Sequence, residues 1–179
     1  EALRRDSEKS PLEKLLRRGA QAKKCYAARL TFRRLDEESR VKARVKWTEG
    51  RQFVAESGSG HSVVIDGPPD HGGRNTGPRP MEMLLMGMGS CTAFDILNIL
   101  DKARADVTDC VAELDAERAD EVPAVFTKIH VHFVVTGHAL KEKQVQRAVE
   151  LSAEKYCSAS IMLVNGGVEI THSFEIIEA

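Results

Sequence analysis

The sequence lacks the features that identify several common classes of protein. Its 179 residues carry a net charge of −1, so no overall positive field favours nucleic acid or an anionic membrane as a partner. The longest charge-free apolar run, residues 83–94, is too short for a transmembrane helix, which needs about 20 residues. No positively charged and then apolar leader with a small-residue cleavage site opens the chain. We therefore expect a cytoplasmic protein.

Several catalytic and metal-binding motifs are also missing. There is no Cys-x-x-Cys or His-x-x-x-His spacing, and we expect His130 and His132 to lie on an exposed strand face rather than to bind a metal. No serine stands in Gly-x-Ser-x-Gly, which argues against a serine hydrolase. The Gly-Ser-Gly of residues 58–60 lacks the flanking strand, helix and lysine of a phosphate loop. Neither a metal nor an organic cofactor is expected.

Charge is divided unevenly between two parts of the chain. Residues 1–40 hold twelve Lys and Arg against seven Asp and Glu, and residues 41–179 hold fourteen against twenty, so the net charges are +5 and −6. Ser10-Pro11-Leu12-Glu13 resembles a helix capping box with proline at the first helical position. We expect residues 1–40 to form a basic, partly helical or disordered extension. An RNA-binding arm is the alternative, but we favour a solvated leader and do not expect nucleic acid as a partner.

From Val41 onward the pattern predicts a single α+β domain over residues 41–179. Apolar and polar residues alternate as they do in half-buried strands, and a loop rich in Gly, Pro and Asp interrupts them at residues 67–77. The first three strands should form an antiparallel meander, and the helical segments should gather against one sheet. The predicted strands are residues 41–47, 52–55, 61–66, 111–118, 126–136 and 168–177, and the predicted helices are residues 80–103, 140–154 and a short turn after Cys157.

The helix predicted at residues 80–103 has an unusual composition. Its first half is apolar nearly all round, which indicates a buried helix. Gly87 and Gly89 each cost a helix interior about 1 kcal/mol relative to alanine. Their presence is better explained by the close approach of another backbone. Four methionines in the same segment, Met81, Met83, Met86 and Met88, are interpreted as core packing that can also line an apolar pocket.

Four cysteines are present, and in a cytoplasmic protein they are expected to be reduced or catalytic rather than a set of structural disulfides. Cys25 and Cys110 are interpreted as packed thiols. Cys91 and Cys157 each stand in an apolar, helix-like segment beside small residues. Two such thiols can undergo a cycle of attack and disulfide closure, so thiol redox chemistry is the leading hypothesis.

The segments around these two cysteines resemble a known family. The run Pro-x-Glu-x-Leu-Leu-x-Gly-x-Gly-Ser-Cys formed by residues 80–91 resembles the first cysteine helix of the OsmC/Ohr family. Residues 154–160, Glu-Lys-Tyr-Cys-Ser-Ala-Ser, resemble its second cysteine motif, and the two cysteines are 66 residues apart. The resemblance covers residues 41–179 in element order and is strongest to the YhfA-like branch.

The resemblance implies a fold, a partner and a reaction. The fold would be an OsmC-like one, with antiparallel sheets wrapped around a central buried helix in an intertwined homodimer. Cys91 would be the peroxidatic thiol that reduces an organic hydroperoxide and becomes a sulfenic acid, and Cys157 would resolve it to a disulfide. An external dithiol would reduce that disulfide. No metal or organic cofactor is implied.

One family residue is displaced in this sequence. Strongly active members carry a glutamate directly after the proline, where this chain has Met81, and Glu82 stands nine residues before Cys91. A shift of one residue rotates a side chain by about 100° around a helix, and nine residues rise about 13.5 Å. Glu82 is therefore a weaker candidate for the family's catalytic glutamate, and it would reach Cys91 only through a bend or from a partner subunit.

The family also uses an arginine to activate the first thiol. Arg51 in the first hairpin is the best match by location, and Arg74 and Arg79 are its rivals. Because the glutamate is displaced, a second function stays open. In that alternative the protein is a non-catalytic or redox-sensing member of the family that binds a small apolar ligand in the same cleft.

Overall fold

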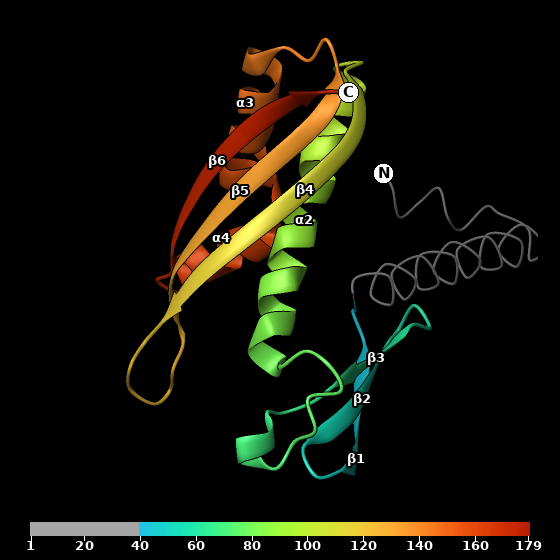
Figure 1. Cartoon of the computed structure of the whole chain (residues 1–179), viewed down its shortest axis with the longest axis vertical. Coiled ribbons are helices and arrows are strands. Elements are labelled where there is room, and N and C mark those ends of the chain that lie inside the picture. Colours follow the sequence, from blue (N-terminus) through green and yellow to red (C-terminus); the bar gives the residue numbers. More distant parts are fainter. Residues whose placement is uncertain (1–39) are drawn as a thin grey trace, which may run out of the picture. The chain divides into compact units, whose positions relative to one another are not determined.

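The computed structural model describes residues 40–179, which form two compact units (Figure 1). One unit contains residues 40–49 and 53–64, and the other contains residues 50–52 and 65–179. The basic extension predicted over residues 1–40, with Cys25, lies outside the described residues apart from Arg40.

The first three strands form a small sheet in the order β1-β2-β3. Their bounds are Ala43–Glu49 for β1, Gln52–Ser57 for β2 and Ser62–Ile65 for β3, close to the predicted ranges. An ion pair of 3.1 Å joins Arg44 on β1 to Glu56 on β2. Every residue of β1 is exposed, including Val45 and Trp47 of the predicted apolar face. That face is therefore not part of a core within one chain.

A second sheet contains β4 (Asp106–Arg118), β5 (Phe126–His138) and β6 (Glu169–Glu178), in that order. Strands β4 and β5 are antiparallel, as expected, whereas β5 and β6 are parallel. The expectation of purely antiparallel sheets was wrong, because the helical segment between β5 and β6 returns the chain to the end at which β5 began. The predicted alternation along β5 is confirmed by its buried side chains, Ile129, Val131, Phe133 and Val135.

Helices cover one face of this sheet, as Figure 1 shows. Helix α2 (Pro80–Lys102) packs on β4, and α3 (Glu142–Leu151) and α4 (Ser158–Asn165) pack against β6. A single π-helical turn, η2 (Ser152–Tyr156), separates α3 from α4. The core lies between the helices and the sheet. Its fully buried apolar side chains include Met88, Ile96 and Leu100 from α2, Val145 from α3, and Val131, Phe133 and Val135 from β5.

Helix α2 is less buried than its composition predicted. The side chains of Leu84, Met86, Phe94 and Leu97 are 54%, 48%, 68% and 41% exposed, so only one face of the helix is packed in a single chain. Among the described helices, α2 alone is long and apolar enough to cross a membrane by length and composition. Of its most apolar stretch of 18 residues, 28% is buried. The core helix of a soluble protein meets the same criteria, and α2 packs against β4 and α3.

The two glycines of α2 have different surroundings. A Cβ placed on Gly89 would lie 2.6 Å from the Cδ1 of Leu114, which is on β4. A side chain, rather than the expected backbone, therefore approaches Gly89. Among the described residues nothing lies within 4 Å of a Cβ placed on Gly87. Gly87 therefore leaves an open space on the surface of α2, one turn before Cys91.

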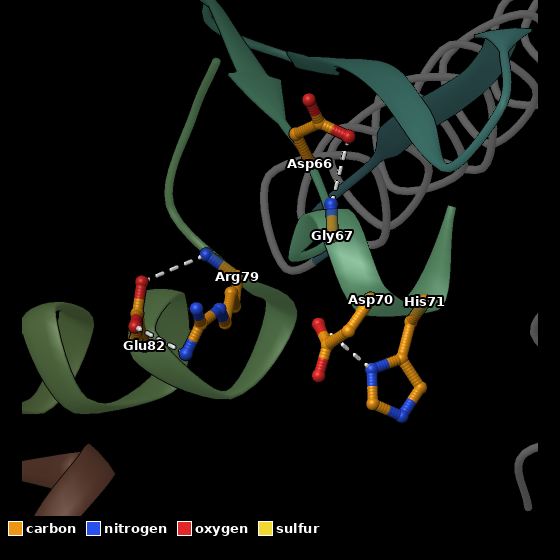
Figure 2. A network of polar contacts seen from close by, with 6 residues as sticks. All are labelled: Asp66, Gly67, Asp70, His71, Arg79 and Glu82. Atoms are coloured by element: carbon orange, nitrogen blue, oxygen red, sulfur yellow. Dashed lines mark hydrogen bonds and ion pairs between the residues drawn. The ribbon is translucent and has the colours of Figure 1, made fainter. Parts of the chain in front are cut away.

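The loop before α2 is organised by a buried carboxylate. Asp66 is 1% exposed and accepts hydrogen bonds from the Thr76 hydroxyl at 2.7 Å and from the backbone N–H groups of Gly67, Arg74 and Thr76 at 2.8, 3.1 and 3.1 Å. Figure 2 shows the Gly67 contact beside the short 3-10 helix η1 (Pro69–His71). The Thr76 hydroxyl is the main cause that lowers the pKa of Asp66 to about 2.

Replacing this carboxylate should destabilise the fold in a pH-dependent way. Asp66→Asn exchanges one acceptor oxygen for an amide that faces N–H donors, so we expect a lower melting temperature at pH 7. The folded pKa lies below the ordinary value of 3.8, so the carboxylate stabilises the fold above about pH 4 and this contribution is lost as the pH falls toward 2. Thermal melts from pH 7 to pH 2 should show the difference from wild type shrinking below pH 4. Asp120→Asn, at an exposed loop position, is the control, and a difference that does not change with pH would contradict this account.

Candidate active site

The structure brings Cys91 and Cys157 together. Cys91 lies in the middle of α2 and is partly exposed, whereas Cys157 directly precedes α4 and is fully buried. Both are free thiols. Their two sulfurs and one carboxylate oxygen of Asp95 all lie within 4.8 Å of one another. The site therefore combines an accessible thiol, an inaccessible thiol and a carboxylate.

The position of Cys157 depends on the π-helical turn before it. The sequence pattern predicted one helix over residues 140–154, but α3 ends at Leu151 and η2 follows. The wider turn ends where the N–H of Cys157 donates to the carbonyl of Ser152 at 2.9 Å. Cys157 then adopts an extended backbone conformation and becomes the N-cap of α4. Single π-helical turns are frequent at functional sites.

Three polar groups surround the sulfur of Cys157. The hydroxyl of Ser160 donates to it at 3.2 Å, the N–H of Ser160 donates at 3.4 Å, and the hydroxyl of Thr92 lies 3.2 Å away. Burial is the largest single influence and opposes a charge on this sulfur, but the hydrogen bonds from Ser160, Thr92 and Cys91 together hold the pKa of the Cys157 thiol below its ordinary value. A thiolate is therefore stabilised at the buried cysteine.

The partly exposed cysteine has the opposite tendency. Burial raises the pKa of the Cys91 thiol, and the neighbouring Cys157 and Asp95 raise it further, while the backbone N–H of Ala159 partly offsets them. Cys91 thus has one N–H donor from α4, and Cys157 has several hydroxyl and N–H donors. The accessible sulfur, that of Cys91, is therefore not the one whose thiolate is stabilised; the stabilised thiolate is that of the buried Cys157.

Asp95 was not identified from the sequence. It stands four residues after Cys91, so both side chains project from the same face of α2. Its Oδ2 is buried and has no hydrogen-bond partner among the described residues. An acidic residue in the middle of an apolar helix, one turn from a candidate thiol, is the signal that would have revealed it.

Comparison with known proteins identifies the family of this chain. The family model described as "OsmC-like protein" matches residues 72–173. Protein YhfA of Escherichia coli strain K12 is 51% identical over 142 residues, which is 78% of this chain and all of that protein. This chain belongs to the OsmC family. The resemblance to its YhfA-like branch is confirmed.

Solved structures share the OsmC-like α+β fold. A hypothetical protein from Aquifex aeolicus VF5 is 28% identical with a TM-score of 0.69, and the match covers 79% of this chain and 98% of that one. An organic hydroperoxide resistance protein OsmC from Legionella pneumophila is 18% identical with a TM-score of 0.58, over 76% of this chain and 96% of that one. At that identity the second likeness concerns the fold alone.

Glu82, a weaker candidate for the catalytic glutamate of the OsmC family, lies at the start of α2. Its carboxylate accepts the backbone N–H of Arg79 at 2.9 Å and lies 3.8 Å from the Arg79 guanidinium, as Figure 2 shows. The first contact is the Glu82 half of a capping box, in which the side chain at N3 accepts the N-cap backbone N–H. Because α2 is continuous from Pro80 to Lys102, the nine residues from Glu82 to Cys91 rise about 13.5 Å. Within one chain Glu82 caps its own helix and does not reach the thiols.

The arginines considered from the sequence are also in other surroundings. Arg79 pairs with Glu82, and the side-chain stem of Arg51 lies against Gly67 and Gly72. The backbone N–H of Arg74 donates to Asp66, which fixes the backbone of Arg74 in the loop before α2. The donors described around the two sulfurs are hydroxyls and backbone N–H groups. A single chain thus stabilises its thiolate without an identified arginine.

The two strand histidines contact hydroxyl groups. His130 makes hydrogen bonds of 2.8 Å with Thr171 and Ser173 of β6, and His132 makes one of 2.8 Å with Ser173. His130 is exposed and His132 is partly buried. These contacts join β5 to β6 and are consistent with the strand-face interpretation.

The buried Thr92 hydroxyl should be important for stability. It lies 3.0 Å from the Met88 carbonyl, 3.2 Å from the Cys157 sulfur and 3.3 Å from the Ser160 hydroxyl, and its single hydrogen can be donated to one of them at a time. Thr92→Val keeps the shape but leaves these buried polar groups with one partner fewer, so the free energy of unfolding should fall by about 1–3 kcal/mol. Urea denaturation under reducing conditions measures this. Thr127→Val, at an exposed position, should change it by less than about 0.5 kcal/mol, and equal effects would contradict the assignment.

Proposed function

We propose that this protein is a thiol-dependent peroxidase that reduces organic hydroperoxides through a two-cysteine cycle. The observation that carries the proposal is an accessible thiol, Cys91, whose sulfur lies within 4.8 Å of a buried second thiol, Cys157. The fold shared with an organic hydroperoxide resistance protein supports it. The cycle requires a dithiol reductant and no metal or organic cofactor. We further propose that it operates in the cytoplasm, where thiols are kept reduced.

The first step takes place at the accessible sulfur. Cys91 first ionises against its raised pKa. Its thiolate attacks the terminal oxygen of the hydroperoxide, the O–O bond breaks, and the alkoxide takes up the proton that Cys91 released and leaves as the alcohol. Cys91 becomes a sulfenic acid, oxidised by two electrons, and the peroxide is reduced by the same two. Cys157 is unsuited to this attack because it is fully buried.

The second step uses the stabilised thiolate of Cys157. It attacks the sulfur of the Cys91 sulfenic acid, and hydroxide leaves and takes up a proton to form water. The two sulfurs must approach from within 4.8 Å to the disulfide bond length of about 2.05 Å. A lowered pKa suits this role, because a thiolate traps the sulfenic acid before further oxidation. A soluble dithiol then reduces the disulfide by attack on the more accessible sulfur.

The surroundings of Cys91 favour an organic substrate. Three residues lie on the same face of α2 as Cys91. Leu84 and Gly87 stand seven and four residues before it, and Phe94 stands three residues after it. Leu84 and Phe94 are exposed apolar side chains, and Gly87 leaves space between them and the thiol. An alkyl or aryl group on the peroxide can contact this surface, whereas hydrogen peroxide has no such group.

The peroxidase cycle is tested by rapid mixing of the reduced protein with cumene hydroperoxide. We expect the loss of two thiols per chain and a Cys91–Cys157 disulfide in the mass spectrum, with slower reaction toward hydrogen peroxide. Cys91→Ser should reduce turnover to the uncatalysed rate. Cys157→Ser should react once and then accumulate over-oxidised Cys91. Cys110→Ser, which removes a thiol outside the site, is the matched control and should behave as wild type.

Slow or absent oxidation of the folded, reduced protein would reject this proposal and favour the alternative function. A cavity of about 1120 Å³ lies between α3, α4 and β6, with acidic as well as apolar side chains among its lining residues, such as Glu150, Ile161 and Phe174, but without Cys91 or Cys157. In the alternative, a small apolar ligand binds the protein without turnover, and the thiols are redox sensors or inert. Thermal stabilisation by such a ligand that survives Cys91→Ser would support that function.

We also propose that the protein acts as a homodimer. Leu84, Met86, Phe94 and Leu97 form an exposed apolar face on α2, and such a face on a soluble protein usually marks an interface. A second copy would cover this face and would enclose the substrate space beside Cys91.

The dimer is tested by a charge on this face. Phe94 is 68% exposed, so Phe94→Glu should cost little stability in an isolated chain but should dissociate a dimer that buries the ring. Sedimentation velocity should show a dimer for wild type and a monomer for the variant. Lys143→Gln, an exposed position on α3 with the same change of charge, should remain dimeric. A monomeric wild type, or a variant as dimeric as the control, would contradict the proposal.

A further inference from the structure

The cluster of Cys91, Asp95 and Cys157 has the composition of a transition-metal site. Each residue offers one ligand atom, and the two sulfurs and the carboxylate oxygen lie within 4.8 Å of one another. We propose that the reduced protein binds one divalent ion of the zinc class through these three side chains. This proposal does not depend on peroxidase activity.

The donor atoms select the kind of metal. Thiolates are soft ligands that bind Zn²⁺ and Co²⁺, whereas Ca²⁺ and Mg²⁺ prefer sites made entirely of oxygen. Two sulfurs and one carboxylate supply three protein ligands, and three is the number in zinc sites that keep a fourth position open for water or another ligand. Because Cys91 is partly exposed, this side of the cluster also provides a route for the ion to enter.

The geometry is close to that of a tetrahedral site. With bonds of about 2.3 Å to sulfur and about 2.1 Å to oxygen, the ligand atoms of a tetrahedral zinc ion are separated by roughly 3.6–3.8 Å. The observed limit of 4.8 Å exceeds this by about 1 Å, which side-chain rotation can close. Cys91 and Asp95 are four residues apart in α2 and project from one face, and Cys157 at the start of α4 completes the set.

A second observation points to a missing ligand at this site. The Oδ2 atom of Asp95 is buried and has no hydrogen-bond partner among the described residues. A buried carboxylate oxygen without a partner is rare because it loses its hydration without compensation. A cation held by the Asp95 carboxylate and the two sulfurs would supply the missing interaction.

The groups behind the sulfurs fit the same role. The hydroxyl of Ser160 donates to the Cys157 sulfur, the Thr92 hydroxyl lies 3.2 Å from it, and the N–H of Ala159 contacts the Cys91 sulfur. Such outer hydrogen bonds orient metal ligands and reduce their negative charge. Both sulfurs therefore already have the support that a metal–thiolate site requires.

Metal binding would depend on whether Cys91 and Cys157 are thiols or a disulfide, although the binding step itself transfers no electrons. The divalent ion displaces the protons of the two thiols, forms two metal–sulfur bonds and one bond to the ionised carboxylate, and up to two protons leave to solvent. A Cys91–Cys157 disulfide has no thiolate left to bind. Oxidation should therefore release the ion, and the bound ion should protect Cys91 from oxidants.

The test is a titration of the reduced full-length protein with Co²⁺, without oxygen and with a non-thiol reductant. We expect saturation at one ion per chain, a thiolate-to-cobalt charge-transfer band in the near ultraviolet, and visible bands with the intensity of tetrahedral cobalt. Zn²⁺ should displace the cobalt and abolish both sets of bands. The same protein after oxidation to the disulfide should give none of them.

Variants identify the ligands. Cys91→Ser and Cys157→Ser should each greatly weaken the charge-transfer band, and Asp95→Asn should weaken Zn²⁺ binding at least about tenfold. The matched controls are Cys110→Ser, a thiol outside the cluster, and Asp101→Asn, an exposed carboxylate on the same helix; both should bind as wild type does. Melting curves without metal establish that each variant is folded.

Three outcomes would overturn the proposal. These are the absence of a charge-transfer band, binding that both cysteine variants retain, and equal binding by the oxidised protein. Retained binding would assign the ion to other groups, such as the histidines of β5. Peroxidase turnover, measured separately with a chelator present, can succeed or fail whatever the cobalt result, so the two proposals are tested independently.

Discussion

The contact between the middle of α2 and the start of α4 is the interaction on which the candidate site depends. Thr92 is fully buried there. Its carbonyl accepts a hydrogen bond from Ser152 at 3.1 Å, and its hydroxyl lies within 3.3 Å of both Cys157 and Ser160. These contacts hold the π-helical turn and the N-terminus of α4 against α2. Without them Cys91 on α2 and Cys157 at the start of α4 would not be held close together, and neither thiol would have its present surroundings.

This contact gives the two thiols different properties. Cys157 combines complete burial with hydroxyl and N–H donors, which lower the pKa of its thiol. Cys91 combines partial exposure with nearby negative groups, and burial and these groups raise the pKa of its thiol. An accessible sulfur that meets a substrate and a protected sulfur that is already inclined to ionise are complementary roles in disulfide formation. Asp95 is partly buried and adds a carboxylate with one buried oxygen to the pair, and the three donors together form the set that a soft divalent ion prefers.

A single chain leaves much apolar surface uncovered. One face of α2 is exposed through Leu84, Met86, Phe94 and Leu97, and β1 has no buried residue. Water contact with these side chains costs free energy in proportion to their area. A partner that covers α2 would remove this cost and would also close the space at Gly87 beside Cys91. The proposed dimer thus connects the stability of the fold with the environment of the thiol.

Much of the fold could be predicted from local patterns. Neighbouring residues carry the signals for the alternation along β5, for the proline at the start of α2 and for the glycine-rich loop before it. The predicted elements agree with the structure within a few residues, except that β4 begins earlier than predicted, at Asp106. The parallel pairing of β5 and β6 was missed, because strand direction depends on the path of the connecting helices. The burial of α2 was overestimated, because composition does not say which faces find a partner.

The sequence by itself determined the family, the α+β element order and the two cysteine motifs, because these are properties of residue type and spacing. Only the tertiary structure decided that Asp95 joins Cys91 and Cys157, that the donors gather on Cys157, and that Glu82 caps its own helix. These facts depend on where a π-helical turn places the start of α4 against α2. Such a contact joins residues about 65 positions apart, and no local pattern encodes it.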